Sequence, residues 1–248
     1  MAEILPIMAR DWALFLDVDG TLLDYAPRPD AVIVPASLPA ILAGLSGALG
    51  GALAIVSGRA IADLDRLFAP LRLPSAGQHG AEARRDDHTC LLAPPSSALA
   101  SILEPVYALG AQDPAIRIEN KGLSAAIHYR ESGPEHEALS AILPAAIAKS
   151  GGAFQLRMSR LAFDIVPRIA NKGRAVAWFM ERAPFVGRVP VFIGDDRTDE
   201  DGFAAVLARG GHAIKVGPRR DSLAPLHMKT PQELRVWLER SLALLGTS

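Results

Sequence analysis

The sequence is poor in cysteine, in basic clusters and in aromatic residues. Its single cysteine, Cys90, can form no internal disulfide and has no partners for a structural zinc site. Aromatic residues make up 6% of the 248 residues, the net charge is −1, and no run of Lys and Arg alternates with aromatics. A nucleic-acid-binding surface usually needs such a run, so we expect no nucleic-acid partner.

The sequence also lacks an evident membrane or export segment. Met1 to Arg10 contain no basic region followed by a long apolar core, the pattern of a signal peptide. Residues 31–58 carry no charge and are long enough to span a bilayer. Prolines and glycines interrupt them repeatedly, which favours a buried helix over 37–49, a glycine turn and a buried strand over 53–56. We therefore expect a cytoplasmic monomer with no membrane partner.

The most informative feature that is present is an apolar strand, residues 13–16, followed by Asp17-Val18-Asp19-Gly20-Thr21. Two carboxylates at the end of a rigid strand face the same small volume. At ~4 Å and a dielectric constant of about 20 they repel by roughly 4 kcal/mol. A divalent cation relieves this repulsion, and Mg²⁺ prefers oxygen ligands together with water and substrate phosphate. One carboxylate is then available to attack phosphorus and the other to transfer protons.

Short apolar strands alternate with amphipathic helices at both ends of the chain, and half of the residues are hydrophobic. Strands over 13–16, 52–56 and 191–193 lack polar alternation, as expected of parallel strands buried on both faces. The strand over 213–216 is a weaker prediction, because Lys215 interrupts it. Thr230-Pro231-Gln232-Glu233 predicts the start of a C-terminal helix. The pattern predicts an α/β fold with a doubly wound parallel-sheet core, residues 1–83 and 168–248.

Residues 84–167 show a different pattern. We predict helix 97–109, strands 116–119 and 123–129, helix 134–149, and strands 153–157 and 161–166. The turns Asn120-Lys121-Gly122 and Met158-Ser159-Arg160 would join the strands into antiparallel hairpins. This smaller α+β unit, inserted into the core domain, is typical of a cap.

Polar clusters follow four of the core elements, where open α/β sheets bind their ligands. Besides Asp17 and Asp19 these are Ser57-Gly58-Arg59, Asn171-Lys172-Gly173 and the acidic stretch 194–200. Ser57 and Thr21 can donate to a phosphate, and Lys172 can supply a positive charge to it. Asp195 can complete the metal ligands, with Asp196 or Asp199 in support. Asn171 is expected to cap its helix.

The motifs 17–21, Ser57, Lys172 and Gly194-Asp195-Asp196 resemble those of the haloacid dehalogenase superfamily of aspartate-based phosphatases. Further motifs are similar to those of the trehalose-6-phosphate phosphatases within its capped sugar-phosphatase branch. These motifs are Ser57-Gly58-Arg59, Gly77-Gln78-His79-Gly80-Ala81-Glu82, Glu119-Asn120-Lys121-Gly122, His128-Tyr129-Arg130 and 194–203. The resemblance covers nearly the whole chain and implies a trehalose-phosphatase, a phosphoric monoester hydrolase.

The resemblance implies a role for each matching residue. Asp17 would be the nucleophile and Asp19 the general acid and base, while Asp17, the backbone carbonyl of Asp19, and Asp195 would hold Mg²⁺. Ser57 and Lys172 would bind the transferring phosphoryl group. The expected substrate-binding residues are Thr21, Gly58, Arg59, His79, Gly80, Glu119, Lys121 and Asp164, of which the last three would contact the sugar from the cap.

One cap strand departs from the family pattern, which usually reads Glu-Xaa-Lys/Arg-Pro. This chain has Asp164-Ile165-Val166-Pro167 instead. Asp164 keeps the charge with a shorter reach, whereas Val166 removes a cation. Arg168 carries a positive charge two positions further on.

Other functions share parts of this pattern. A capped phosphatase for sucrose 6-phosphate, a hexose phosphate or mannosyl phosphoglycerate would use the same core residues, and so would a phosphomutase. A sugar-phosphate sensor without catalysis would normally have lost the nucleophile or the metal aspartate. Asp17, Asp19, Lys172 and Asp195 are all present, which favours an enzyme.

Overall fold

The computed structural model describes residues 5–26, 31–129, 133–158, 162–218 and 221–246. The chain forms two compact units, Met1–Cys90 with Asn171–Ser248, and Leu91–Ala170. The first boundary lies after the predicted 83/84, because two short strands, β4 and β5, continue the sheet of the first unit. The second lies three residues after the predicted 167/168. Among the described residues, no helix has the length and apolar character needed to cross a membrane.

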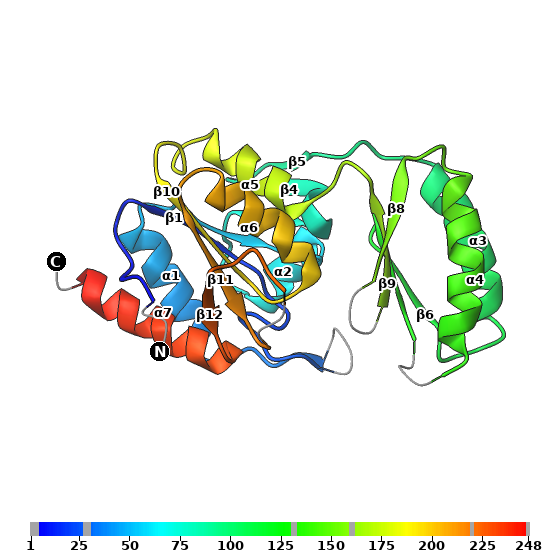
Figure 1. Ribbon diagram of the computed structural model, residues 1–248, viewed down its shortest axis with the longest axis horizontal. Helices are drawn as coiled ribbons and strands as arrows, with labels where there is room; N and C mark the ends of the chain where they lie inside the picture. Colours follow the sequence, from blue (N-terminus) through cyan, green and yellow to red (C-terminus); the bar gives the residue numbers. More distant parts are fainter. Residues whose placement is uncertain (1–4, 27–30, 130–132, 159–161, 219–220, 247–248) are drawn as a thin grey trace. The chain divides into compact units, whose positions relative to one another are not determined.

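The first unit is built on an eight-stranded sheet with the order β12-β11-β10-β1-β2-β3-β4-β5 (Figure 1). Neighbouring strands from β12 to β3 are parallel, whereas β3 and β4 are antiparallel. The strands are β1 (Trp12–Leu16), β2 (Leu53–Val56), β3 (Ser75–Gly77), β4 (Glu82–Arg84), β5 (Thr89–Leu91), β10 (Val189–Gly194), β11 (His212–Val216) and β12 (Leu226–Met228). The predicted parallel core is confirmed; the three-residue strands β4, β5 and β12 were not predicted, because they are too short to show a period.

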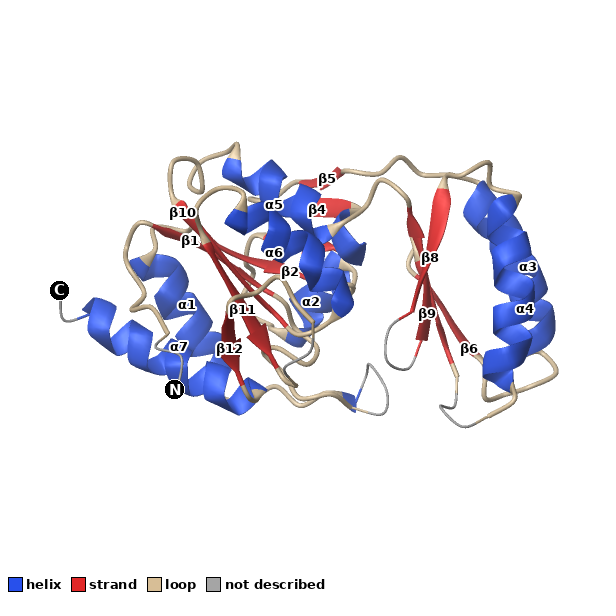
Figure 2. Ribbon diagram, viewed as in Figure 1, coloured by secondary structure: helices blue, strands red, loops and turns tan. Residues whose placement is uncertain are grey.

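The central strands are buried on both faces because helices cover both sides of the sheet (Figure 2). On β1, Leu14 and Leu16 belong to a large apolar cluster that includes residues of the helices α1 (Leu38–Ala48) and α7 (Pro231–Gly246). Phe15 points to the opposite face, where its ring lies 5.9 Å from that of Phe179. A strand enclosed in this way has no exposed face, which explains its uniform hydrophobicity.

The other helices of the first unit are α2 (Ile61–Leu67), α5 (Lys172–Met180) and α6 (Glu200–Leu207). Helix α5 starts where the sequence indicates, since the Asn171 side chain accepts a hydrogen bond from the backbone N–H of Arg174. Helix α7 begins after Thr230, whose hydroxyl accepts from the N–H of Glu233. These local signals therefore position two helices correctly.

The second unit has its own sheet and its own apolar core. Its strands, in the order β6-β7-β9-β8, are β6 (Arg117–Asn120), β7 (Ala125–His128), β8 (Phe154–Met158) and β9 (Ala162–Pro167). All three neighbouring pairs are antiparallel, and two of them, β6-β7 and β8-β9, are the strand pairs of the predicted hairpins. Helices α3 (Ala98–Gly110) and α4 (Glu135–Ala148) pack on one face. Of the predicted turn 158–160, only Met158 is among the described residues, and Arg130 and Leu161 also lie outside them.

Candidate active site

The site begins at the carboxyl ends of two adjacent parallel strands, β1 and β10. Their register pairs Leu16 with Ile193, and the N–H of Asp17 continues the ladder by donating to the Ile193 carbonyl at 3.0 Å. Asp17 and Asp195 therefore leave the sheet at the same edge, although 178 positions separate them in the sequence. The predicted convergence of the two strand ends is thus a consequence of the parallel pairing.

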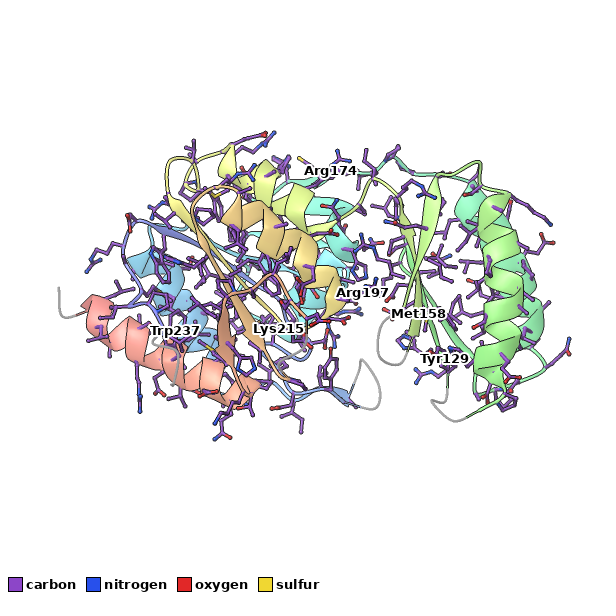
Figure 3. The ribbon with its side chains drawn as sticks, in the orientation of Figure 1. Tyr129, Met158, Arg174, Arg197, Lys215 and Trp237 are labelled. Carbon is purple, nitrogen blue, oxygen red and sulfur yellow. The ribbon has the colours of Figure 1, made fainter. Side chains whose placement is uncertain are left out.

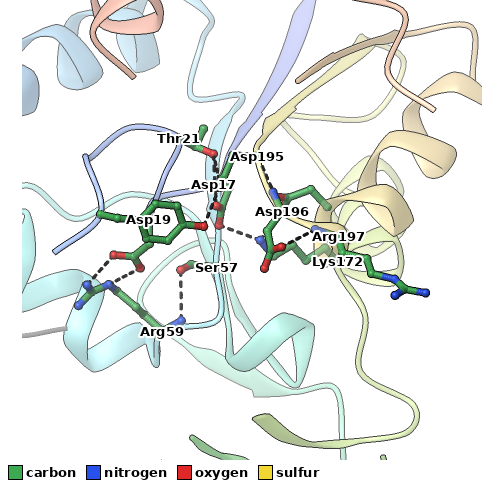
Figure 4. A network of polar contacts seen from close by, with 11 residues as sticks. Asp17, Asp19, Thr21, Ser57, Arg59, Lys172, Asp195, Asp196 and Arg197 are labelled. Carbon is green, nitrogen blue, oxygen red and sulfur yellow. Dashed lines mark hydrogen bonds and ion pairs between the residues drawn. The ribbon is translucent and has the colours of Figure 1, made fainter. Parts of the chain in front are cut away.

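A buried ion-pair cluster lies at this edge (Figure 4). The Nζ atom of Lys172 donates to Asp17 Oδ1 at 2.8 Å and to Asp199 Oδ1 at 2.6 Å. The three side chains are only 3%, 6% and 0% exposed for Lys172, Asp17 and Asp199 respectively. Because burial makes each charge costly on its own, the lysine and its two carboxylates are stable only as a group.

This cluster is buried and carries more negative than positive charge, and both facts shift its pKa values. Burial raises the pKa of Asp17, and the charges of Asp199 and Asp195 add to the rise, while Lys172 opposes it. Burial and the charge of Asp199 likewise raise the pKa of Asp195 to about 6. Burial alone would lower the pKa of Lys172, but the charges of Asp17 and Asp199 outweigh it and raise that pKa. The lysine is therefore a permanent cation beside three crowded acids.

Asp195 is held by hydrogen bonds on both its carboxylate and its backbone. Its Oδ1 accepts from the Thr21 hydroxyl at 3.1 Å and its Oδ2 from the Tyr25 hydroxyl at 2.7 Å. The Nζ atom of Lys215 donates to its carbonyl at 2.5 Å. Lys215 lies on β11 and is labelled in Figure 3. The turn between β1 and Tyr25 is correspondingly close-packed: a Cβ at Gly20, whose φ is +83°, would lie 2.3 Å from Asp195 Oδ2.

Asp199 organises the loop that follows β10. Its Oδ2 accepts from the backbone N–H groups of Asp195 and Asp196, each at 2.9 Å, while its Oδ1 accepts from Lys172. Asp196 in turn caps the short 3-10 helix Arg197–Asp199. Asp199 and Asp196 thus fix the loop on which Asp195 is carried.

The donor set fits a hard divalent cation. Asp17, Asp195 and Asp199 each offer a carboxylate oxygen, and these atoms lie within 4.8 Å of one another. Oxygen ligands of this kind suit Mg²⁺, and a cation would offset the crowding that raises the acidic pKa values. Asp199 accepts three hydrogen bonds, from Lys172 and from two backbone N–H groups, whereas Asp17 and Asp195 accept two each. Asp17 and Asp195 therefore have more lone pairs left for a metal and are the better ligands.

Asp19 and Ser57 lie at the same edge but have different partners (Figure 4). The guanidinium of Arg59 binds the Asp19 carboxylate with two hydrogen bonds, from Nε at 2.7 Å and from Nη2 at 2.6 Å. Ser57 is buried, and its Oγ accepts from the backbone N–H of Arg59 at 3.2 Å. Because Ser57 Oγ is the acceptor in that bond, its O–H can still donate to a ligand.

A tight loop, Gln78–Gly80, supports the Ser57-Gly58-Arg59 segment. The N–H groups of Gln78 and His79 donate to the carbonyls of Arg59 and Ser57, at 2.8 and 3.0 Å. Gln78 and His79 both have positive φ values, 50° and 58°, which is costly for residues other than glycine. The strained backbone places the His79 ring against Gly58, where an added Cβ would lie 2.8 Å from the ring. Glycine is therefore required there to leave room for the ring.

The remaining predicted site residues belong to the second unit and share one face of its sheet. The register aligns Glu119, Ala126, Asp164 and Arg157 across four strands. The apolar residues on either side of this row, such as Ile127 and Phe163, point to the opposite face and into the core. Glu119 also lies 3.2 Å from His128 Nε2 and 3.9 Å from Lys121 Nζ.

Three site residues were missed by the sequence analysis: Tyr25, Lys215 as a functional group, and Glu82. Glu82 accepts from the N–H of Ile61 at 2.9 Å and from the Gln78 side chain at 3.2 Å, so it joins the start of α2 to the loop 78–80. The signal for Lys215 was available, because a cation that interrupts an apolar strand must find a buried acceptor. Nothing in the sequence indicated the Tyr25 contact.

Comparisons with known sequences identify a matching family. The profile of the trehalose-phosphatase family matches residues 15–230. The trehalose-6-phosphate phosphatase of Escherichia coli K12 is 42% identical over 214 residues, which cover 86% of this chain and 80% of that protein. A probable trehalose-phosphate phosphatase of Sinorhizobium fredii NGR234 is 43% identical over 208 residues, with 84% and 78% covered.

Solved structures show the same fold. A trehalose-6-phosphate phosphatase related protein has a TM-score of 0.80 at 23% identity, covering 94% of this chain and 98% of that one. BT1666 of Bacteroides thetaiotaomicron, a phosphatase of the haloalkanoate (HAD) enzyme superfamily, has a TM-score of 0.62 at 16% identity, and both chains are fully covered. At these identities the likeness concerns the fold alone.

Proposed function

This chain belongs to the trehalose-phosphatase family, and on that premise we propose that it hydrolyses trehalose 6-phosphate to trehalose and inorganic phosphate. It is an enzyme, a phosphoric monoester hydrolase of the haloacid dehalogenase superfamily. The observation that carries the assignment is the buried group formed by Asp17, Lys172 and Asp199 beside Asp195. A nucleophilic carboxylate next to a fixed cation and a metal-ligand set is what phosphoryl transfer requires.

The proposed reaction has two steps. Asp17 attacks the phosphorus, the bond from phosphorus to the sugar oxygen breaks, and an aspartyl phosphate forms. Asp19 gives its proton to the departing oxygen, and then accepts a proton from the water that hydrolyses the aspartyl phosphate. Proton transfer avoids the expulsion of a sugar alkoxide, which is a poor leaving group.

Positive charge around the phosphoryl group stabilises both steps. Lys172 holds an oxygen of the phosphoryl group while it keeps Asp17 in place, and Ser57 donates its hydroxyl to another oxygen. Mg²⁺ would be held by Asp17, the backbone carbonyl of Asp19, and Asp195, with Asp196 and Asp199 supporting them, and when bound it neutralises negative charge on the phosphoryl oxygens. Thr21, Gly58, His79 and Gly80 line the phosphate side of the proposed site.

The second unit supplies the sugar contacts in this proposal. Glu119 and Asp164 are acceptors for sugar hydroxyls, and Lys121 is a donor. The support from the structure is their position on one sheet, where small Ala126 stands between the two acids. The remaining expectations, a monomer and a cytoplasmic location, are tested by analytical ultracentrifugation and by cell fractionation.

A panel of phosphate-release assays tests the function. We expect Mg²⁺-dependent release from trehalose 6-phosphate that exceeds release from sucrose 6-phosphate and glucose 6-phosphate. Asp17→Asn should lower the rate by more than about a thousandfold, because an amide cannot form the acyl phosphate.

The matched control is Asp24→Asn, which changes an exposed acid of the same segment that pairs with Arg235. It should retain normal activity. Turnover by a sequence-verified Asp17→Asn protein would exclude the covalent mechanism. A preference for glucose 6-phosphate would instead reject the disaccharide substrate and leave the phosphatase assignment standing.

A further inference from the structure

Arg59 is the direct partner of Asp19. Its Nε and Nη2 atoms reach the two different oxygens of the Asp19 carboxylate, at 2.7 and 2.6 Å (Figure 4). Two parallel hydrogen bonds from a planar group fix the plane of the carboxylate as well as its distance. A single hydrogen bond would fix the distance alone.

Both the main chain and the side chain of Arg59 are constrained. Its N–H donates to Ser57 Oγ, its carbonyl accepts from the Gln78 N–H at 2.8 Å, and its side chain is only 13% exposed. Asp19 is less enclosed, with a side chain that is 31% exposed. The fixed partner in this pair is therefore Arg59, and the partner that needs orientation is Asp19.

We infer that Arg59 is a positioning residue that holds the carboxyl group of Asp19 in the orientation needed for both proton transfers. The inference rests on the proposed function, in which Asp19 is the acid and then the base. It assigns to Arg59 a role on the enzyme's own acid instead of a contact with the substrate.

The two steps explain why a fork of hydrogen bonds is useful. In the first step the proton moves from Asp19 to the sugar oxygen as the bond from phosphorus to that oxygen breaks, and the carboxylate left behind is matched by the guanidinium. In the second step that carboxylate takes a proton from water, whose oxygen bonds to phosphorus as the aspartyl phosphate bond breaks. No covalent bond of Arg59 forms or breaks in either step. Its two hydrogen bonds keep the plane of the Asp19 carboxyl group oriented toward the sugar oxygen in the first step and toward the water in the second.

Arg59→Lys is the test, because lysine keeps the charge but cannot form the fork. Two substrates that differ in their need for the acid are compared in single-turnover experiments. Release of trehalose needs a proton, whereas the nitrophenolate of p-nitrophenyl phosphate leaves without one. We expect the first rate to fall about 10- to 100-fold, as for a misplaced catalytic group. The first-turnover release of nitrophenolate should stay within about twofold of the wild-type rate.

The control is Arg209→Lys, which changes an exposed arginine just after α6 that donates to the Ala205 carbonyl. It should leave both rates unchanged. A double-mutant cycle with Asp19→Asn adds a second readout: if Arg59 acts through Asp19, Arg59→Lys should cause no further loss in the Asp19→Asn background. Thermal unfolding checks that each variant folds, and Arg59→Gln replaces Arg59→Lys if that variant does not.

Two results would overturn the inference. Equal losses on both substrates together with a raised KM would make Arg59 a substrate-binding residue. Rates no different from those of Arg209→Lys would leave it without a role in the reaction. Both results presuppose an active wild-type enzyme; an inactive wild type, or an active Asp17→Asn variant, would count against the proposed function instead.

Discussion

At the scale of single residues, hydrogen bonds within the protein orient the carboxylate of Asp195 without help from a ligand. Thr21 and Tyr25 donate to its two oxygens, and Lys215 holds its carbonyl. Hydrogen bonds of this kind orient a metal ligand and tune its affinity. Tyr25 is notable among these donors because it is partly exposed, so its loss would leave little empty space.

Tyr25→Phe should therefore weaken Mg²⁺ binding about tenfold or more without unfolding the protein. The measurement is isothermal titration of Mg²⁺ into the protein at pH 7. Tyr107→Phe, which removes the hydroxyl of another partly exposed tyrosine, should bind as the wild type does. An unchanged affinity in Tyr25→Phe would show that the Tyr25 hydroxyl does not orient Asp195.

At the scale of elements, the loop Gln78–Gly80 connects the Ser57 segment to the start of α5. Gly80 has a φ of +91°, and a Cβ there would lie 2.5 Å from the Asn171 carbonyl. The loop can approach this closely only because residue 80 has no side chain. The position of Lys172 at the first turn of α5 depends on that approach.

Gly80→Ala should lower the free energy of unfolding by a few kcal/mol, of which about 1–2 kcal/mol comes from the positive φ and the rest from the clash. Gly217→Ala is the matched control, since Gly217 has a φ of +89° and nothing within 4 Å of an added Cβ. Urea unfolding of both variants separates the two contributions. Equal losses would show that the backbone moves at no cost to avoid Asn171.

The sheet of the second unit supports a prediction about specificity. Ala126 lies between Glu119 and Asp164 on the polar face, so Ala126→Val adds bulk between the two proposed sugar acceptors. We expect KM for trehalose 6-phosphate to rise about tenfold, while turnover of p-nitrophenyl phosphate stays unchanged. Ala108→Val, on the exposed side of α3, is the control. Equal effects on both substrates would argue against a sugar site on this face.

At the scale of the whole molecule, the two units have separate apolar cores, and all three tryptophans lie in the first unit. Tryptophan fluorescence therefore reports the unfolding of the unit that carries the acidic cluster. The pKa of Asp195 is raised from 3.8 to about 6 in the folded protein. Between these values the folded state keeps a proton that the unfolded state has lost, so stability falls as pH rises.

Without Mg²⁺, the free energy of unfolding should fall by on the order of 2 kcal/mol between pH 4 and pH 6. At pH 7, saturating Mg²⁺ should restore about 2–3 kcal/mol at a concentration of roughly one hundred times Kd. Fluorescence-detected urea unfolding with EDTA or with Mg²⁺ gives both values. Asp195→Asn should weaken the pH dependence, leaving the part that the raised pKa of Asp17 contributes, and abolish the Mg²⁺ effect. A wild type that gains stability from pH 4 to pH 6 would contradict the assignment.

The sequence by itself determined the elements and the types of residue at the site. Uniformly apolar runs predicted the buried strands β1, β2 and β10, because a strand covered on both faces needs no polar residue. The carboxylates and hydroxyls that follow them predicted phosphoryl transfer, because that chemistry needs those groups at strand ends. The hairpins and helix caps could also be predicted, since residues that are neighbours along the chain specify them.

Only the tertiary structure decided which groups bond to which. That Arg59 binds Asp19, that Tyr25 and Lys215 hold Asp195, and that Glu82 binds the N–H of Ile61 depends on contacts between segments well separated in the sequence. The short strands β4, β5 and β12 are likewise formed by pairing with a sheet that already exists. The residues next to each group in the sequence do not indicate such partners. The contacts form only when the parallel strands bring distant loops to one edge of the sheet.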